Sequence, residues 1–373
     1  MDFERSEDQV LLAETVSRFL ADRAPILPYV RELLASDIGT TAEVWAGLGE
    51  LGVLGLLVPE EHGGAGMGMV DVSVVLEALG RGVHPGPYLS SAVGAVSLVT
   101  IAGSDDDQRA LLPGLATGEI VGTVATWEPG PRARWREPQT TAAPAGEGWQ
   151  LDGTKVHVPD AVGADLLLVI ARPPEGGCGV FAVTPGADGL TVAATPTVDG
   201  TRKEATVELV GVVARRLGDG DATDAVAETL DRLGVGMVVD GVGAAQRAME
   251  LAVEYAKERR QFDAPIGTFQ AVQHLCADML RAVELARAAG YYACWACDAA
   301  DSGERHRAAT MAQAFAADSL YEVGANAIQV FGGVGFTWEH DIHLFYKRLL
   351  TLQHFAGGTV DQLEELASIV LDT

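Results

Sequence analysis

Positive charge is scarce in this chain. Lysine and arginine number 26 against 52 aspartates and glutamates, so the formal net charge is −26 and the isoelectric point lies near 4.5. Nucleic acids and anionic membrane surfaces carry negative charge and repel such a chain. The composition therefore argues against both as general partners. Any anionic ligand would need a local group of cations.

Cysteines and long apolar runs are also few. The four cysteines are Cys178, Cys276, Cys294 and Cys297. Cys294 and Cys297 have CxxC spacing, but they lie in an apolar helical stretch without a second pair, so we interpret them as core residues and predict no metal site. No apolar run reaches the roughly 18 residues that span a bilayer, and the acidic start does not resemble a signal peptide. We expect a soluble cytoplasmic protein with no membrane partner.

The periodicity of apolar residues changes twice along the 373 residues. It is helical over 1–121, strand-like over 122–220 and helical again over 221–373. Asp152-Gly153 is typical of a hairpin turn within the strand-like part. We therefore predict an α+β chain of three domains with these boundaries. The expected strands are Thr123–Trp127, Trp149–Val158, Leu166–Ala171, Val180–Val183, Leu190–Ala194 and Ala205–Val213.

Two segments in the last domain stand out. In the first, YAKERRQFDAPIGTFQ, Lys257, Arg259 and Arg260 crowd the end of a periodic helix. In the second, IQVFGGVGFTWEH, Gly332 and Gly333 follow a helix, and glycines allow the backbone to approach a ligand closely. Taken singly, the first pattern is equally typical of a solvated helix end and the second of a helix C-cap.

Together, the two segments resemble the C-terminal half of acyl-CoA dehydrogenases, and the order helices, β domain, helices extends the resemblance over the whole chain. It implies the acyl-CoA dehydrogenase fold, with a helical, a β-barrel-like and a four-helix-bundle domain. It also implies FAD, whose ADP half is held across a subunit interface. The residues to which it assigns this role are Arg259, Gln261, Phe262, Gln329, Gly332 and Gly333.

The same resemblance locates the catalytic base, and here the chain departs from the family. The family places a glutamate at one of two positions, which are Leu233 and Gly357 in this sequence. Neither residue accepts a proton. Among nearby acids only Asp240 shares the helix face of Leu233, at roughly 10 Å along the axis. We consider Asp240 the one conceivable replacement.

The segments that meet the flavin ring in the family also differ. A Thr-Glu-Pro segment ending in Gly-Ser-Asp reads WEPGPRAR here, with Trp127 for the threonine and Ala133-Arg134 for Ser-Asp. The Trp-Ile-Thr that follows in the family is here His157-Val158-Pro159. The ring side of the site is degraded, whereas the ADP side is retained.

These observations predict a non-catalytic subunit of a hetero-oligomeric, α2β2 acyl-CoA dehydrogenase. A catalytic partner would bind most of the acyl-CoA, and this chain would complete the partner's FAD site. The resemblance suggests steroid side-chain or fatty acid degradation. Two alternatives stay open: a homo-oligomeric enzyme with a displaced base, and a scaffold that holds no flavin.

Overall fold

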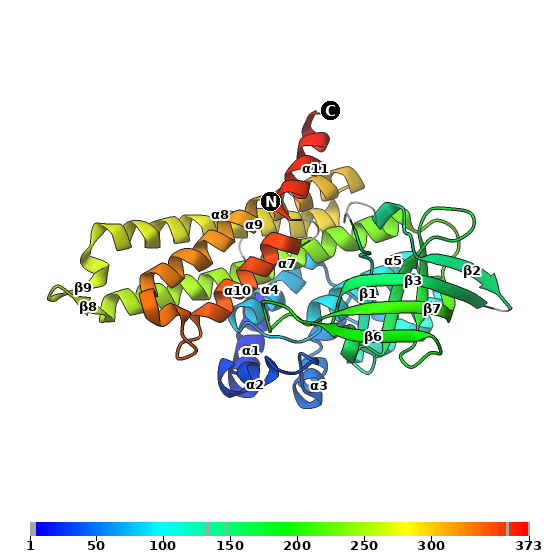
Figure 1. Ribbon diagram of the computed structural model, residues 1–373, viewed down its shortest axis with the longest axis horizontal. Helices are drawn as coiled ribbons and strands as arrows, with labels where there is room; N and C mark the ends of the chain where they lie inside the picture. Colours follow the sequence, from blue (N-terminus) through cyan, green and yellow to red (C-terminus); the bar gives the residue numbers. More distant parts are fainter. Residues whose placement is uncertain (1–4, 131–134, 147, 356–357, 372–373) are drawn as a thin grey trace. The chain divides into compact units, whose positions relative to one another are not determined.

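The computed structural model describes residues 5–130, 135–146, 148–355 and 358–371. By its internal contacts the chain divides into two compact units, each built from separated segments (Figure 1). The bundle unit comprises Met1–Val30, Ser73–His84 and Gly234–Thr373, and the sheet unit comprises Arg31–Val72 and Pro85–Leu233. The boundaries at 121/122 and 220/221 stay a prediction.

Long helices make up the bundle unit. α8 and α9 pack along each other, and α10 and α11 both pack on α9. A two-residue hairpin, β8–β9, joins α7 to α8 at one end of the bundle (Figure 1). The elements are α1 (Glu7–Arg23), α4 (Met69–Arg81), α7 (Thr223–Glu258), β8 (Arg260–Gln261), β9 (Ala264–Pro265), α8 (Gln270–Ala299), α9 (Ser302–Phe331), α10 (Ile342–His354) and α11 (Thr359–Leu371). Only the parts of α4 from Ser73 and of α7 from Gly234 belong to this unit.

Glycines allow α4 and α7 to approach each other closely. A Cβ on Gly80 of α4 would lie 1.9 Å from the Asp240 carbonyl oxygen, and one on Gly243 of α7 would lie 2.1 Å from the Glu77 carbonyl oxygen. Both distances are far inside van der Waals contact. The glycines of α7 therefore serve packing, although glycine lowers helix propensity.

Seven strands form the sheet of the second unit, in the order β1-β4-β5-β7-β3-β2, with β6 paired to β7. β1 and β4 are parallel and the other pairs are antiparallel. The strands are β1 (Gly122–Ala125), β2 (Thr141–Ala145), β3 (Gly148–Pro159), β4 (Leu166–Ala171), β5 (Gly179–Val183), β6 (Leu190–Thr195) and β7 (Glu204–Leu217). The helices of this unit are α2 (Arg31–Leu33), α3 (Ala42–Glu50), α5 (Val96–Ala102) and α6 (Asp105–Thr117).

The hairpin turn expected at Asp152-Gly153 was wrong. Both residues lie inside β3 and pair with Val210 and Leu209 of β7. The Asp152 carboxylate instead accepts the backbone N–H of Gly211, at 2.8 Å, where β7 bulges. A Cβ on Gly153 would lie 2.7 Å from the Cα of Thr140, so this glycine permits a close approach rather than a turn.

The six strands expected from the sequence are present, and β2 was missed. β2 is an edge strand of small residues, TAAPA, with one buried side chain, so it has no apolar alternation. The last third is predominantly helical among its described residues, as its periodicity predicted. Cys294 and Cys297 are buried in α8, as their interpretation as core residues requires.

Candidate functional site

The two segments singled out in the sequence meet at one pocket of the bundle unit. It has a volume of about 540 Å³ and opens to solvent at the end of the bundle that carries β8–β9. The end of α7 and the hairpin supply one side, and the end of α9 with the following 3-10 helix, Gly332–Phe336, supplies the other. Its lining residues are Tyr255, Arg259, Gln261, Ile266, Val330, Phe331, Gly332, Gly333, Val334 and Thr337.

Four of the six residues expected to hold the ADP half of FAD line this pocket: Arg259, Gln261, Gly332 and Gly333. Gln329 and Phe262 do not line it; the side chain of Phe262 is 88% exposed. A Cβ on Gly333 would meet no atom of the described residues within 4 Å. A ligand could therefore approach the backbone here directly. The pocket is large enough for part of a dinucleotide, because ligand pockets usually span roughly 300–1,000 Å³.

Local backbone geometry fixes the arginine at the mouth of the pocket. The Arg259 N–H donates to the Tyr255 carbonyl at 2.8 Å, which continues the α7 ladder, and its carbonyl accepts from Ile266 N at 2.8 Å. The floor is aromatic: the rings of Tyr255 and Phe331 stack with centroids 4.4 Å apart. Arg259 is thus held by its main chain and exposes its guanidinium.

The dipoles of α7 and α9 do not favour an anion in this pocket. Both α7 and α9 end at it, and a helix C-terminus carries partial negative charge. Gly332 caps α9 with φ +63°, and its N–H donates to the Gln329 and Ile328 carbonyls. The ends of α7 and α9 therefore offer no helix N-terminus to an anion in this pocket, and Arg259 is the cationic side chain in its lining.

The hairpin beside the pocket carries strained residues. Phe262 and Asp263, the two residues between β8 and β9, have φ of +52° and +64°. A two-residue turn requires such values, which glycine and asparagine adopt easily and phenylalanine does not. The Phe262 ring is exposed and contacts Phe269 edge-on, with ring centroids 6.1 Å apart.

More large apolar side chains are exposed next to this pocket. Phe336 and Trp338, which flank the pocket-lining Thr337, are 78% and 62% exposed. Lys347 lies 4.9 Å over the Trp338 ring. Exposed aromatic residues gathered around an open pocket are typical of an interaction surface. Sequence periodicity did not identify this group, because it lies on short connecting segments.

The structure describes one of the two base positions. Leu233 lies on α7 within the sheet unit and is 9% exposed. A Cβ on Gly94 would lie 3.1 Å from Leu233 Cδ2, so the leucine packs closely on that glycine. Gly357 lies outside the described residues. An apolar side chain fills the position at which the family resemblance expects a carboxylate.

Asp240 is held in a buried ion pair. Arg348 Nε and Nη2 donate to its two carboxylate oxygens, each at 2.9 Å. Arg348 and Asp240 are 2% and 3% exposed, and Arg348 Nη2 also donates to the His84 carbonyl at 2.8 Å. Burial, and then the charge of Arg348, lower the pKa of His84 to about 3, so this imidazole is neutral. A carboxylate whose two oxygens both accept from one arginine is a poor proton acceptor.

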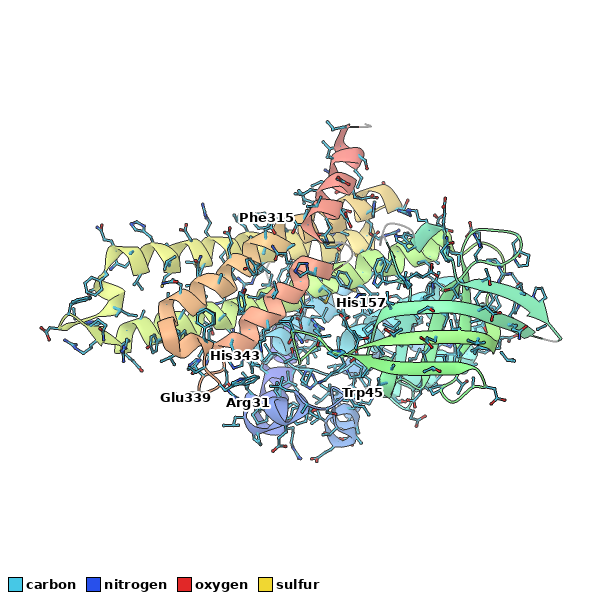
Figure 2. All side chains as sticks on the ribbon, viewed as in Figure 1. Arg31, Trp45, His157, Phe315, Glu339 and His343 are labelled. Carbon is cyan, nitrogen blue, oxygen red and sulfur yellow. The ribbon has the colours of Figure 1, made fainter. Side chains whose placement is uncertain are left out.

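The residues that replace the family's flavin-ring segments make other contacts within the sheet unit. His157 on β3 is exposed and lies 2.7 Å, Nδ1 to Oε2, from Glu204 (Figure 2). The Trp127 carbonyl accepts from Val156 N at 2.9 Å, and the Pro159 carbonyl accepts from Thr123 Oγ1 at 2.6 Å. Ala133 and Arg134 lie outside the described residues.

Glu128, next to Trp127, takes part in a buried ion pair that the sequence reading missed. Lys155 Nζ donates to Glu128 Oε1 at 2.7 Å and to the Thr126 carbonyl at 3.2 Å. The carboxylate also accepts the N–H groups of Gln139 and Thr140 at 2.6 and 2.8 Å. Burial lowers the pKa of Lys155 to about 8, although Glu128 opposes this shift. Lys155 lies on the same face of β3 as Leu151, and both side chains are buried. A lysine on the apolar face of a strand is the sequence signal that could have revealed this ion pair.

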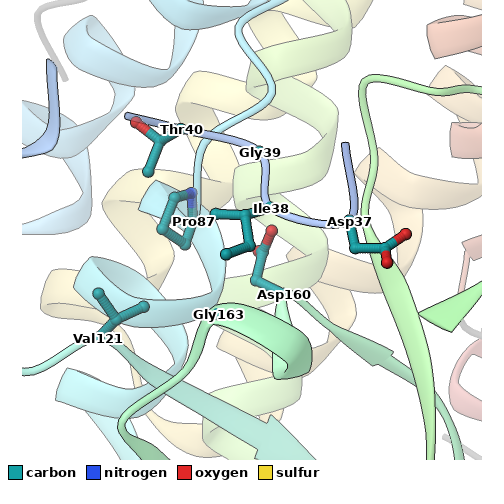
Figure 3. Close-up of a pocket in the computed structure, with 8 residues that line it drawn as sticks. All are labelled: Asp37, Ile38, Gly39, Thr40, Pro87, Val121, Asp160 and Gly163. Atoms are coloured by element: carbon teal, nitrogen blue, oxygen red, sulfur yellow. The ribbon is translucent and has the colours of Figure 1, made fainter. Parts of the chain in front are cut away.

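A second pocket lies in the sheet unit and holds about 30 Å³, which is room for one water molecule. Figure 3 shows Ile38, Pro87 and Asp160 around it. The Asp160 carboxylate accepts from Ser90 Oγ at 2.6 Å. This pocket is too small for a cofactor. Across the described ranges, no three His, Cys, Asp or Glu side chains gather to hold a metal ion, and no helix is long and apolar enough to cross a membrane.

Comparison with protein families covers nearly the whole chain. Residues 6–119 match the acyl-CoA dehydrogenase N-terminal domain, 123–211 the middle domain and 223–371 the C-terminal domain. Among characterised relatives, acyl-CoA dehydrogenase IpdE2 of Mycolicibacterium smegmatis is 30% identical over 98% of this chain and 99% of its own. Acyl-CoA dehydrogenase FadE27 of Mycobacterium tuberculosis is 31% identical, with both chains covered fully.

Solved structures give the same assignment. A variant of the steroid ACAD Tcur3481-Tcur3483 superposes with a TM-score of 0.90 at 32% identity, covering 98% of each chain. The ChsE4-ChsE5 complex from Mycobacterium tuberculosis superposes with a TM-score of 0.90 at 29% identity, covering all of both chains. This chain therefore has the acyl-CoA dehydrogenase fold, with an N-terminal helical, a middle β and a C-terminal helical domain, and it belongs to the acyl-CoA dehydrogenase family.

Proposed function

We propose that this chain is the non-catalytic subunit of a hetero-oligomeric, FAD-dependent acyl-CoA dehydrogenase. Its role is to hold the ADP half of a flavin whose ring belongs to a catalytic partner. One observation carries the proposal: the pocket of about 540 Å³ retains Arg259 and the open glycines, while a buried leucine, Leu233, occupies a base position. The residues present fit the ADP half of a flavin site, and they do not fit its catalytic half.

Arg259, Gln261, Gly332 and Gly333 are the residues that would hold the ADP moiety. The guanidinium pairs with phosphate oxygens in planar, charge-assisted hydrogen bonds. The backbone at Gly333 admits close approach of the ligand, and the stacked Tyr255 and Phe331 rings keep water from the floor. When bound, FAD supplies the hydride acceptor for acyl-CoA dehydrogenation. The proton acceptor must come from the partner, because Leu233 cannot act as one and Asp240 is paired with Arg348.

The partner is inferred from two observations. The pocket is open, so a second chain must cover whatever it holds, and the exposed Phe262, Phe336 and Trp338 supply apolar contact area around it. Two solved relatives are complexes of differently named chains, Tcur3481-Tcur3483 and ChsE4-ChsE5. We extend this architecture, as an α2β2 assembly in the cytoplasm, to the present chain. Because the Tcur3481-Tcur3483 protein is a steroid ACAD, we propose a steroid acyl-CoA as the substrate class.

Substitution of Arg259 tests the ADP site. In the co-expressed complex, Arg259→Ala should weaken FAD binding about 10–100-fold, since one charge-assisted contact to a phosphate is worth about 1.5–3 kcal/mol. Lys257→Ala is the matched control: it removes the same charge from the end of α7, but Lys257 does not line the pocket. Flavin retention on dialysis measures the effect. Equal retention in both variants would contradict the assignment of Arg259.

A further inference from the structure

One histidine contacts both ends of the loop that lines the proposed ADP pocket. The loop comprises residues 332–341 and joins α9 to α10. The loop residues that line the pocket are Gly332, Gly333, Val334 and Thr337. His340 lies near the second end of the loop, and its ring contacts the ring of Phe331 at the end of α9, with centroids 4.2 Å apart. This contact brings the second end of the loop back to the first.

The imidazole of His340 also caps α10. The first N–H groups of an α-helix have no acceptor within the helix itself. Ile342 is the first residue of α10, and its N–H donates to His340 Nδ1 at 3.1 Å. A ring nitrogen that accepts a hydrogen bond carries no proton, so this imidazole is neutral and its proton is on Nε2. A neutral ring suits the position, because the N-terminal end of a helix dipole opposes a cation.

The ring contact continues to the arginine side of the pocket. Phe331 is buried, and its ring stacks on Tyr255 of α7 with centroids 4.4 Å apart. One turn further along the chain, the Arg259 N–H donates to the Tyr255 carbonyl at 2.8 Å. Three rings therefore connect the start of α10, the end of α9 and the end of α7. Aromatic pairs have preferred relative arrangements, so they fix how these three segments lie beside one another.

We propose that His340 is a positioning residue for this pocket. It does not line the pocket itself, and it acts through the Phe331 ring and the start of α10. With both contacts made, the loop that carries Gly333 is held beside the end of α7 that carries Arg259. The identity of the ligand rests on the flavin role proposed above. The two contacts of His340 need no ligand, so they can be measured on this chain alone.

Substitutions that keep one contact of His340 and remove the other test the proposal. His340→Asn keeps an acceptor close to the position of Nδ1 and removes the ring, whereas His340→Phe keeps a ring and removes the acceptor. His340→Ala removes both. Hydrogen exchange of the purified full chain is measured at two amides: the Ile342 N–H reports on the start of α10, and the Gly332 N–H reports on the end of α9.

Each variant should release only the end whose contact it lacks. The Phe and Ala variants should exchange the Ile342 N–H about tenfold faster than the wild type, the size expected for one hydrogen bond, and the Asn variant should not. The Asn and Ala variants should exchange the Gly332 N–H faster, and the Phe variant should not. Unchanged exchange of Ile342 in His340→Ala would overturn the proposal. Equal acceleration at both amides in all three variants would mean general loosening and would overturn it as well.

His354→Ala is the matched control. His354 lies in the last turn of the same helix, is exposed and does not line the pocket. This variant removes a histidine from α10 without removing either contact of His340. It should exchange both amides as the wild type does, and faster exchange of Ile342 in this variant would count against a specific role of His340.

Flavin retention in the co-expressed complex then connects the contacts of His340 to the pocket. His340→Ala should weaken FAD binding about threefold to tenfold, less than Arg259→Ala does, because it removes no contact to the ligand. If Arg259→Ala loses flavin and His340→Ala retains it fully, His340 does not position the pocket and the proposal is wrong. If neither variant loses flavin while exchange changes as predicted, the contacts of His340 stand and the flavin role fails instead.

Discussion

Single residues carry the proposed division of the flavin site into a retained and a lost half. Arg259 and the two glycines could be read from the sequence because each belongs to a recognisable motif and is positioned by its own backbone. The sequence could not show that Phe262 and Gln329 lie outside the pocket lining, because neighbouring residues on a turn or at a helix end point in different directions. The ion pairs Arg348–Asp240 and Lys155–Glu128 join residues 108 and 27 positions apart. A local pattern can mark a buried charge such as Lys155, but it does not identify the residue with which that charge pairs.

Substitution of Asp240 distinguishes a structural from a catalytic carboxylate. Asp240→Asn leaves Arg348 buried without its counter-ion, so it should lower stability by about 3–5 kcal/mol. The rate of flavin reduction by acyl-CoA in the complex should stay unchanged among the folded molecules. Stopped-flow measurement of flavin bleaching, with calorimetry on the same samples, separates the two effects. An unchanged melting temperature with lost flavin reduction would make Asp240 the base.

Lys155 gives a pH-dependent prediction. Lys155→Met leaves the Glu128 carboxylate, whose side chain is 12% exposed, without its cation. The loss should be about 3–5 kcal/mol at pH 7. It should shrink as pH falls, because an unpaired buried carboxylate protonates more readily than the wild-type Glu128, whose pKa the lysine and its hydrogen-bond donors hold below the usual value.

The titration of Lys155 itself acts at high pH. Its pKa falls from 10.5 to about 8 on folding, so between these values the unfolded chain binds a proton that the folded chain has released. This group therefore raises stability as pH increases through that window. Urea unfolding of the wild type and Lys155→Met at about pH 8 and 10 measures this effect. Urea unfolding of the same two proteins and of Lys155→Met/Glu128→Gln at about pH 5 and 7 measures the deficit caused by the unpaired Glu128. A deficit that is the same at both pH values, with no recovery in the double variant, would refute the account.

At the scale of elements, apolar periodicity predicted the long helices and most strands. Asp152-Gly153 was wrongly predicted to form a turn. Inside a strand, an aspartate can accept a hydrogen bond at a bulge, and a glycine can allow a neighbouring backbone to approach. β2 was missed because an edge strand of small residues has no buried face to repeat. The β8–β9 hairpin was also not foreseen, since phenylalanine and aspartate at positive φ do not follow turn preferences.

Glycine contacts between α4 and α7 lead to an element-scale prediction. Gly80→Ala and Gly243→Ala each place a Cβ about 2 Å from a backbone oxygen, at 1.9 and 2.1 Å. Each should lower the free energy of unfolding by about 1–3 kcal/mol, the usual cost of overpacking. Gly303→Ala near the start of α9 is the control: its nearest contact is Asp301 Oδ1 at 3.4 Å, so it should be neutral or slightly stabilising. Thermal unfolding of the three variants tests this prediction. If the unfolding midpoints of all three equal that of the wild type, α4 and α7 can move apart without loss of stability.

For the whole molecule, the chain has the acyl-CoA dehydrogenase fold, whereas the described base position holds a leucine, Leu233. Family resemblance could predict the fold because the core pattern extends over the full length. It could not predict the role, since that depends on a few positions, among them Leu233, where a buried leucine packs on Gly94. Under the proposed role, the scaffold is kept because the partner needs the surface that it provides.

Flavin content with and without the partner tests the central claim most directly. The chain purified alone, its partner alone and the co-expressed complex are compared by flavin absorbance, and each is then titrated anaerobically with acyl-CoA. We predict that this chain alone contains no stoichiometric flavin and that the complex contains flavin that acyl-CoA bleaches. Removing the partner's base should abolish the bleaching while FAD stays bound. If this chain alone binds stoichiometric flavin and acyl-CoA bleaches it, the non-catalytic assignment is wrong.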